Sequence, residues 1–426
     1  MKITRLSVAN LRAFEQASFD FDPGFTLLVG VNGVGKTTVL EALRIGLSRL
    51  LPQFTASKSR PEAFTTEDIR VGDPSLTVDL DFIMEGTERH WLLHKQRVQN
   101  VPHKDGIVRE QTLETPDREA ISPAFGKEAR ALKSAKTQPI ALYFATRRSM
   151  VSDEQVKIGK ASGGQATSFA YALAPRPLRL VYLAEWMLAQ ERLSPELPRA
   201  AEHLKAFRAA AQRFLPDCQS LRAEKDNSER PRLLVTKGGI SLDVRQLSDG
   251  ERSMLALVLD LAQRLSQANP GLDDPVRDGA AVVLIDELDM HMHPLWQRQV
   301  MSLLTGTFPN CQFVATTHSP QIISETQPDR IILLQLKNGQ IIAERCGQAY
   351  GLDANYVLEQ IMGTPSRPVA VSAAIGAVED ALEAADLELA REKLAQVRDL
   401  QHGDDPTSVG LEAAINNLEA LADEAD

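Results

Sequence analysis

Residues 30–37 read Gly-Val-Asn-Gly-Val-Gly-Lys-Thr, and this stretch decides the fold class. It matches the full pattern of a loop that binds phosphate groups, in which glycines let backbone N–H groups point inward at the N-terminus of a helix. The apolar run at 25–29 predicts a buried strand before the loop, and Val39, Leu40 and Leu43 predict a helix after it. Strand, loop and helix occur in the required order, which argues against a chance match.

The loop also predicts which side chains contact a nucleotide and its metal ion. The Lys36 ammonium would reach the β- and γ-phosphates, and the Thr37 hydroxyl would bind Mg²⁺. The expected nucleotide-binding residues at the loop and the start of its helix are Asn32, Gly33, Gly35, Lys36, Thr37 and Thr38. ATP and Mg²⁺ are therefore the expected cofactors.

Residues 282–287 read Val-Val-Leu-Ile-Asp-Glu, an apolar strand that ends in two carboxylates. Ligands of parallel α/β sheets bind beyond the carboxyl ends of the strands. We expect Asp286 to bind Mg²⁺, directly or through water, and Glu287 to orient or deprotonate the attacking water. Alone, the pattern also fits an ordinary strand followed by an acidic helix cap. The phosphate loop favours the catalytic interpretation.

Two further segments carry candidate phosphate ligands. Residues 246–252, Gln-Leu-Ser-Asp-Gly-Glu-Arg, precede an apolar helix, so Ser248 and Gly250 could form a second anion site. The simpler interpretation is a helix N-cap. Residues 315–320, Ala-Thr-Thr-His-Ser-Pro, place His318 after another predicted strand. A single histidine is more often structural, but this position after the carboxylates favours a phosphate contact.

The rest of the chain predicts an α/β fold. Between 250 and 343 helices and strands alternate, which is typical of a mostly parallel sheet. We expect helices at about 250–268 and 295–304 and strands at 281–285, 311–316, 331–334 and 340–343. Period-two alternation between Ser75 and Leu113 predicts an antiparallel β subdomain, and a helical stretch runs from about Pro177 to Phe214.

The C-terminal part differs in charge and pattern. The net charge of the chain is −10; residues 371–426 hold 14 acidic and 3 basic side chains, which is −11, so the remainder carries about +1. Helical spacing with breaks near 384–386 and 403–406 predicts a small antiparallel helical appendage, either an interaction module or an ordinary capping bundle. We therefore expect a head at 1–345, with a helical insertion at about 165–225, and an acidic helical appendage at 346–426.

Composition narrows the class further. No run of 18 apolar residues occurs, so we expect no membrane association. The cysteines, Cys218, Cys311 and Cys346, lack metal-binding spacing, which fits a cytoplasmic protein and argues against a disulfide framework. The pair His291 and His293 lacks further matched ligands, so packing is favoured over metal binding. No dense Lys/Arg block marks a nucleic-acid surface, and binding of nucleic acid stays open.

In their order along the chain, these segments resemble the head of ABC-type ATPases. In that family, Ser248 and Gly250 of one head would bind the γ-phosphate of ATP held by the phosphate loop of a second head. His318 would contact the γ-phosphate within its own head. The resemblance thus implies three catalytic residues: Glu287, Lys36 and His318. The resemblance thus implies an ATPase that works as a homodimer around ATP, with further assembly left open.

Other residues resemble the SMC/RecF/OLD branch of that family. Asp249 replaces the first glycine of the transporter-type signature. The opening segment 8–14 also resembles this branch, in which Arg12 would lie near the nucleotide phosphates. The alternative for Arg12 is an ordinary surface arginine. Leu288-Asp289 resembles the D-loop that communicates across the dimer. Arg147-Arg148 stand roughly where the Q-loop would be, but no Q-loop glutamine can be named.

The segments 286–299 and 307–313 resemble stand-alone ATPases of the PtuA (Septu) type, which act in antiphage defence beside a separate nuclease, often of the HNH kind. The chain shows neither the sustained heptads of SMC arms nor a Toprim pattern, so we do not expect it to cut nucleic acid itself. A RecF-like repair factor that binds DNA directly, and a scaffold that holds its nucleotide without hydrolysis, are the alternatives.

Overall fold

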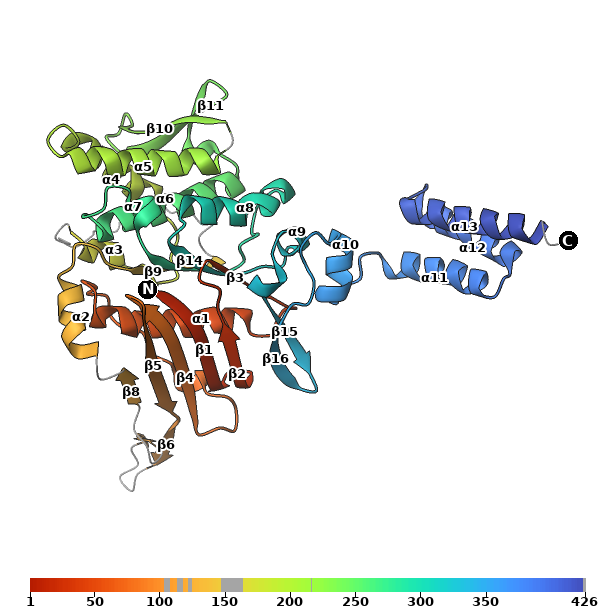
Figure 1. Ribbon diagram of the computed structural model, residues 1–426, viewed down its shortest axis with the longest axis horizontal. Helices are drawn as coiled ribbons and strands as arrows, with labels where there is room; N and C mark the ends of the chain where they lie inside the picture. Colours follow the sequence, from red (N-terminus) through yellow and green to blue (C-terminus); the bar gives the residue numbers. More distant parts are fainter. Residues whose placement is uncertain (103–107, 113–117, 122–124, 147–163, 216, 424–426) are drawn as a thin grey trace. The chain divides into compact units, whose positions relative to one another are not determined.

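The structure is a computed structural model that describes residues 1–102, 108–112, 118–121, 125–146, 164–215 and 217–423 (Figure 1). The chain divides into two compact units, Met1–Leu352 and Asp353–Asp426. Within the described residues, no helix combines the length and the apolar character needed to cross a bilayer.

A six-stranded sheet forms the centre of the first unit, in the order β16-β15-β3-β14-β13-β9. Its strands are β3 (Phe25–Val29), β9 (Ile140–Phe144), β13 (Ala281–Ile285), β14 (Cys311–Thr316), β15 (Ile331–Lys337) and β16 (Gln340–Arg345). Strands β15, β3, β14, β13 and β9 run parallel, and β16 is antiparallel to β15. Every side chain of β3, β9, β13 and β14 is buried, as in parallel sheets covered on both faces. The predicted mostly parallel sheet is confirmed.

The carboxyl ends of β3, β13 and β14 meet at one edge of this sheet. Ile285 pairs with Ala315, and Thr316 pairs with Leu28. The phosphate loop follows β3, the acidic pair follows β13, and His318 follows β14. The sheet topology therefore brings three segments together that are far apart in the sequence.

Helix α1 (Lys36–Leu50) begins directly after the phosphate loop and is packed between two sheets (Figure 1). It contacts β13 and β14 of the central sheet and β4 and β5 of the antiparallel sheet described next. At Gly46 an added Cβ would lie only 2.3 Å from Leu80 Cδ1, so the helix and that sheet approach closely. This core on both sides holds the start of α1, and with it the loop, in place.

The predicted antiparallel β subdomain is confirmed as a five-stranded sheet in the order β2-β1-β4-β5-β8. Its strands are β1 (Lys2–Leu11), β2 (Phe14–Asp20), β4 (Ser75–Met84), β5 (Thr87–Gln96) and β8 (Arg118–Ile121). Strand β4 alternates strictly between buried and half-buried residues, because one face packs against α1 and the other is polar. The hairpin between β4 and β5 turns at Glu85-Gly86, and a separate pair, β6 (Val98–Pro102) and β7 (Val108–Thr112), follows it.

The helical stretch predicted as continuous is two helices, α4 (Leu180–Leu193) and α5 (Pro198–Phe214). Prolines at 195 and 198 separate them, since proline favours the first turn of a helix and interrupts its interior. The helices end at Phe214, and a three-stranded sheet of β10 (Cys218–Lys225), β11 (Pro231–Lys237) and β12 (Ile240–Asp243) follows. Strand β10 was not predicted, because Leu221 is its one buried residue and no alternation marks it.

Helix α6 (Asp249–Ala268) is the longest helix of the first unit and is buried along most of its length. The shorter helices of this unit are α2 (Phe125–Lys133), α3 (Ala166–Phe169), α7 (Pro275–Asp278), α8 (Pro294–Thr307) and α9 (Pro320–Ser324). Single 3-10 turns lie at Leu51–Gln53, Thr66–Asp68, Val244–Gln246 and Pro328–Arg330. Helices α6 and α8 begin at Asp249 and Pro294, close to the predicted starts at about 250 and 295.

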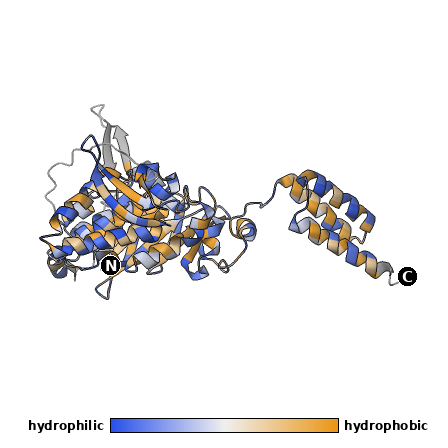
Figure 2. Cartoon of the chain, turned by 90° about the horizontal axis from the view of Figure 1, so that it is seen from above, coloured by the Kyte–Doolittle hydropathy of each residue, from blue (hydrophilic) through white to orange (hydrophobic). Residues whose placement is uncertain are grey.

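The second unit is helical, as its sequence predicts. Its main helices are α11 (Val369–Glu383), α12 (Leu387–Gln401) and α13 (Pro406–Asp423), preceded by α10 (Ala354–Tyr356) and a π-helical turn at Val357–Ile361. Each main helix carries hydrophilic and hydrophobic residues (Figure 2), and the buried ones form a small core. This core contains Ile375, Val378, Ala381, Ala390, Leu394, Val397 and Ile415.

Candidate nucleotide site

The phosphate loop needs glycine at two positions for reasons visible in its surroundings. Gly35 has φ of 90°, and a Cβ there would lie 2.7 Å from the ring of Phe14. Gly30 has φ of 153°, and a Cβ there would lie 2.4 Å from the carbonyl oxygen of Leu334. Larger residues are excluded at both positions, so the loop keeps the tight path that turns its N–H groups inward.

The remaining loop residues present polar groups around this path. Asn32, Gly33 and Thr37 are exposed, and Thr38 is half-buried in the first turn of α1. Lys36 is only 7% exposed, and its Nζ donates hydrogen bonds to the carbonyls of Gly30 (2.7 Å) and Val31 (3.0 Å). The ammonium group is therefore held over the loop.

The acidic pair faces the loop from the end of β13. Thr37 Oγ1 lies 3.3 Å from both carboxylate oxygens of Asp286. Burial lowers the pKa of Lys36, and the nearby carboxylates of Asp286, Glu287 and Asp289 oppose that effect. A hydroxyl and a carboxylate that face each other from two elements are the oxygen ligands that Mg²⁺ prefers, with phosphate and water completing its octahedron. The residues present thus fit a magnesium ion bound by Thr37 and Asp286.

His318 follows β14 on the same edge of the sheet. Burial, and next the positive charge of Lys36, lower the pKa of His318 from its ordinary 6.5. The imidazole is therefore neutral at pH 7 and can donate one N–H to a phosphate oxygen. Asp289 positions the backbone here, because its Oδ1 accepts hydrogen bonds from Thr317 Oγ1 (2.5 Å) and from the His318 N–H (3.1 Å). The sequence offered no signal for this contact beyond the D-loop resemblance.

Ser248 forms the N-cap of α6 in a capping box with Glu251. The Glu251 N–H donates to Ser248 Oγ (3.3 Å), and Ser248 Oγ donates to the Glu251 carboxylate (2.9 Å). Lys237 in turn pairs with that carboxylate at 2.5 Å. Among the described residues, Ser248 makes no hydrogen bond to the phosphate loop. The plain N-cap is thus present, and the predicted contact with a second head remains a prediction.

Gly250 has a reason to be glycine within this same chain. A Cβ there would lie 2.2 Å from the carbonyl oxygen of His291, which itself has a positive φ of 61°. The start of α6 and the segment that follows the acidic pair therefore touch backbone to backbone. His293 caps α8 by accepting a hydrogen bond from the Leu295 N–H at its Nδ1 (3.3 Å). The His293 side chain thus caps a helix, and the preference for packing over metal binding at the two histidines stays a prediction.

Arg12 is held by Asp68, which ends the 3-10 turn at Thr66–Asp68. Its N–H donates to the Asp68 carbonyl (2.7 Å), and its guanidinium forms an ion pair with the Asp68 carboxylate (2.8 Å). Asp68 is held in turn by the Thr65 N–H (2.7 Å). The predicted approach of Arg12 to the phosphates stays a prediction. Arg147 and Arg148, which stand roughly where the Q-loop would be, lie outside the described residues.

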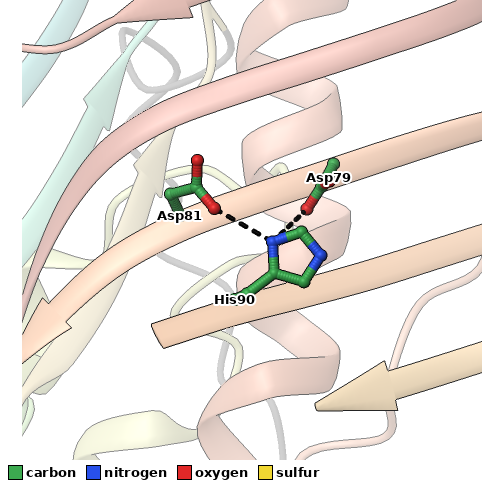
Figure 3. Close-up of side chains that lie close together, drawn as sticks. All are labelled: Asp79, Asp81 and His90. Carbon is green, nitrogen blue, oxygen red and sulfur yellow. Dashed lines mark hydrogen bonds and ion pairs between the residues drawn. The ribbon is translucent and has the colours of Figure 1, made fainter. Parts of the chain in front are cut away.

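A second polar cluster lies on the outer face of the antiparallel sheet. His90 Nδ1 is 2.9 Å from Asp79 Oδ1 and 3.0 Å from Asp81 Oδ1 (Figure 3). In the described part of the chain, these three residues are the group whose ligand atoms lie close enough together for a metal ion. The hydrogen bond between His90 Nδ1 and Asp81 Oδ1 gives the imidazole a partner within the sheet, so we assign no metal to the cluster.

The fold and the site together define an ATP-binding protein of the P-loop ATPase class. A phosphate loop and an acidic pair meet at the carboxyl edge of a parallel sheet, as this class requires, and a histidine lies at the same edge. The chain belongs to the family described as "AAA domain, putative AbiEii toxin, Type IV TA system", whose model matches residues 25–324.

Relatives support this assignment over most of the chain. The Retron Ec83 probable ATPase of Escherichia coli is 26% identical over 430 residues, which cover 86% of this chain and 77% of that protein. The Septu protein PtuA of Bacillus thuringiensis is 22% identical over 373 residues, which cover 85% of this chain and 84% of that protein. The Retron Vc95 probable ATPase of Vibrio cholerae is 23% identical over 422 residues, which cover 87% of this chain and 80% of that protein. The resemblance to stand-alone ATPases of the PtuA type is confirmed.

Proposed function

We propose that two copies of this chain close around ATP and hydrolyse it, and that this cycle regulates a separate nuclease in an antiphage defence system. The observation that carries the ATPase proposal is the meeting of Lys36, Thr37, Asp286 and Glu287 at one sheet edge. The dimer is proposed from the resemblance of residues 246–252 to the ABC-type signature, which lies at the N-terminus of α6. Such a helix N-terminus suits a phosphate supplied by a second head.

The chemistry would follow from the positions of the side chains. Lys36 and the N–H groups of the loop would bind the phosphates, and Thr37 and Asp286 would hold Mg²⁺, which neutralises phosphate charge. Glu287 would accept a proton from the attacking water as the water oxygen bonds to the γ-phosphorus, while the bond from that phosphorus to the oxygen bridging the β-phosphate breaks and ADP leaves. The neutral imidazole of His318 would donate a hydrogen bond to a γ-phosphate oxygen. In such reactions, positioning of the reactants and stabilisation of charge in the transition state supply most of the rate enhancement.

The defence role rests on the relatives, which are named for retron and Septu systems. We propose the cytoplasm as the site of action and a nuclease of the HNH kind as partner. The head would comprise residues 1–345, with the acidic appendage at 346–426 available for the partner. In the second unit, exposed acidic side chains outnumber basic ones, which suits contact with a basic surface.

Light scattering of Glu287→Gln tests the clamp. This change keeps ATP binding but removes the base, so the variant should accumulate as a dimer at saturating ATP. Lys36→Ala is the matched control, because it should lose ATP and stay in the nucleotide-free state. A Glu287→Gln protein that stays monomeric with bound ATP would contradict the clamp.

A pull-down from the native cell with tagged Glu287→Gln tests the defence role. Mass spectrometry should find a nuclease in stoichiometric amount. Recovery of repair proteins or DNA alone, with salt-dependent DNA affinity of the isolated chain, would instead favour the RecF-like function. ATP that stays intact on long incubation with the wild-type dimer would favour a scaffold.

A further inference from the structure

The threonine at the end of β14 lies beside the acidic pair. Strands β13 and β14 are parallel and in register, with Ile285 opposite Ala315. The next residues along the two strands, Asp286 and Thr316, therefore leave the sheet side by side. Thr316 is 1% exposed, so its hydroxyl must find its hydrogen-bond partners within the protein.

The Thr316 hydroxyl contacts both acidic residues at once. Its oxygen accepts a hydrogen bond from the backbone N–H of Glu287 at 2.7 Å. The same oxygen lies 2.7 Å from Asp286 Oδ1. A hydroxyl has one hydrogen, and the N–H can only donate, so the hydroxyl hydrogen is directed to the Asp286 carboxylate. One side chain thus sets the orientation of that carboxylate and the position of the next backbone N–H.

Glu287 needs this support because its backbone is strained. Its φ is +50°, a left-handed conformation that residues other than glycine adopt only when their surroundings enforce it. The hydrogen bond from its N–H to Thr316 Oγ1 fixes one side of the residue. The Leu288 N–H donates to the Thr316 carbonyl at 2.8 Å and fixes the other. The direction in which the Glu287 side chain leaves the sheet edge is set by these two bonds.

We propose that Thr316 is a positioning residue for ATP hydrolysis, whose single hydroxyl orients the metal-binding carboxylate of Asp286 and the water-activating carboxylate of Glu287 together. The inference rests on the proposed ATPase function. The Thr316 hydroxyl is directed at Asp286 and at the Glu287 backbone, so it acts through the two acids. An ordinary buried threonine would satisfy its hydroxyl on one backbone carbonyl of its own strand or helix, as Thr326 does on Ile322 at 2.6 Å.

Steady-state ATPase kinetics of Thr316→Val, Thr316→Ser and Thr326→Val test the proposal. Valine keeps the shape and removes the hydroxyl, and kcat should fall about 10–100-fold, because small errors in catalytic geometry carry effects of that size. KM for ATP should change by less than about threefold, since the phosphate loop is intact. Serine restores the hydroxyl and should recover most of the loss. Thr326→Val, a buried threonine outside the site, should leave kcat unchanged.

Binding of Mn²⁺ to the ADP complex, followed by electron paramagnetic resonance, gives a readout independent of turnover. Thr316→Val should weaken it at least about threefold, because Asp286 loses its orienting donor. If Thr316→Val unfolds, Thr316→Ala replaces it in the comparison with serine. Wild-type kcat and Mn²⁺ affinity in a folded variant without the hydroxyl would overturn the proposal. A wild-type protein that binds ATP but never hydrolyses it would instead refute the proposed function.

Discussion

Asp260 is a buried carboxylate on which we expect the stability of the first unit to depend. It lies on α6 with 5% of its side chain exposed, between Arg264 (7%) and Arg176 (20%). It accepts hydrogen bonds of 3.0 and 3.1 Å from Arg176 and one of 2.9 Å from Arg264. Arg264 also donates to the carbonyls of Ser168 and Ala170, so the cluster ties α6 to the segment that contains α3.

Replacing Asp260 by alanine should lower the free energy of unfolding by about 3–5 kcal/mol, because Arg264 is left buried without its counter-charge. Arg176 contributes less to this loss, since it can turn toward water. The double variant Asp260→Leu/Arg264→Met removes both buried charges. It should lose only about 1–3 kcal/mol, which reflects the two backbone carbonyls left without a donor.

Urea unfolding followed by tryptophan fluorescence measures these changes in the first unit alone, because Trp91, Trp186 and Trp296 all lie in it. Burial alone would raise the pKa of Asp260, but the two guanidinium groups outweigh it and hold that pKa below its ordinary 3.8. Its contribution is therefore present above pH 3.8 and is lost as the pH falls through the lower folded value. The alanine penalty should be constant from about pH 5 to 8 and shrink in stronger acid.

The reasoning fails if Asp260→Ala lowers the free energy of unfolding by less than about 1 kcal/mol at pH 7, or if the double variant is no more stable than the single one. The first result would mean that Arg264 reaches water or another acceptor. The second would mean that the cost arises from the lost carbonyl contacts and not from the unpaired charge.

Three other perturbations follow from contacts in the site. Gly250→Ala should lower the free energy of unfolding of the nucleotide-free chain by about 1–3 kcal/mol, because the new Cβ meets the His291 carbonyl at 2.2 Å. If urea unfolding shows unchanged stability, the glycine is not needed for packing within the chain, and only a role of Gly250 toward a second head would be left. Asp289→Ala should reduce kcat about tenfold or more by releasing the His318 backbone, whereas Asp289→Asn keeps the accepting oxygen and should be milder; equal kcat values for the two would contradict this. Because the pKa of His318 is lowered, the unfolded chain binds that proton at a higher pH than the folded chain. The free energy of unfolding should therefore fall as pH drops below 6.5, and His318→Gln should show a smaller fall between pH 7.5 and 5.5.

Several elements could be predicted to the residue, and their surroundings explain why. Strands β3, β13 and β14 are buried on both faces, so each reads as a mostly apolar run with clear ends. Strand β10 was missed because Leu221 is its one buried residue, and a strand with so little buried surface imposes no apolar pattern.

For the site, the sequence by itself determined the residues whose chemistry follows from local order. Lys36 and Thr37 end a loop, and Asp286 and Glu287 end a strand, so chain-local rules suffice to find them. Only the tertiary structure decided that Thr316 orients the acidic pair, that Asp289 holds the backbone of His318, and that Gly250 meets His291. These contacts depend on which strands are neighbours and in what register. A hydroxyl about thirty residues from its partner along the chain leaves no trace in local sequence pattern, because hydrogen bonds act over distance in space and not along the chain.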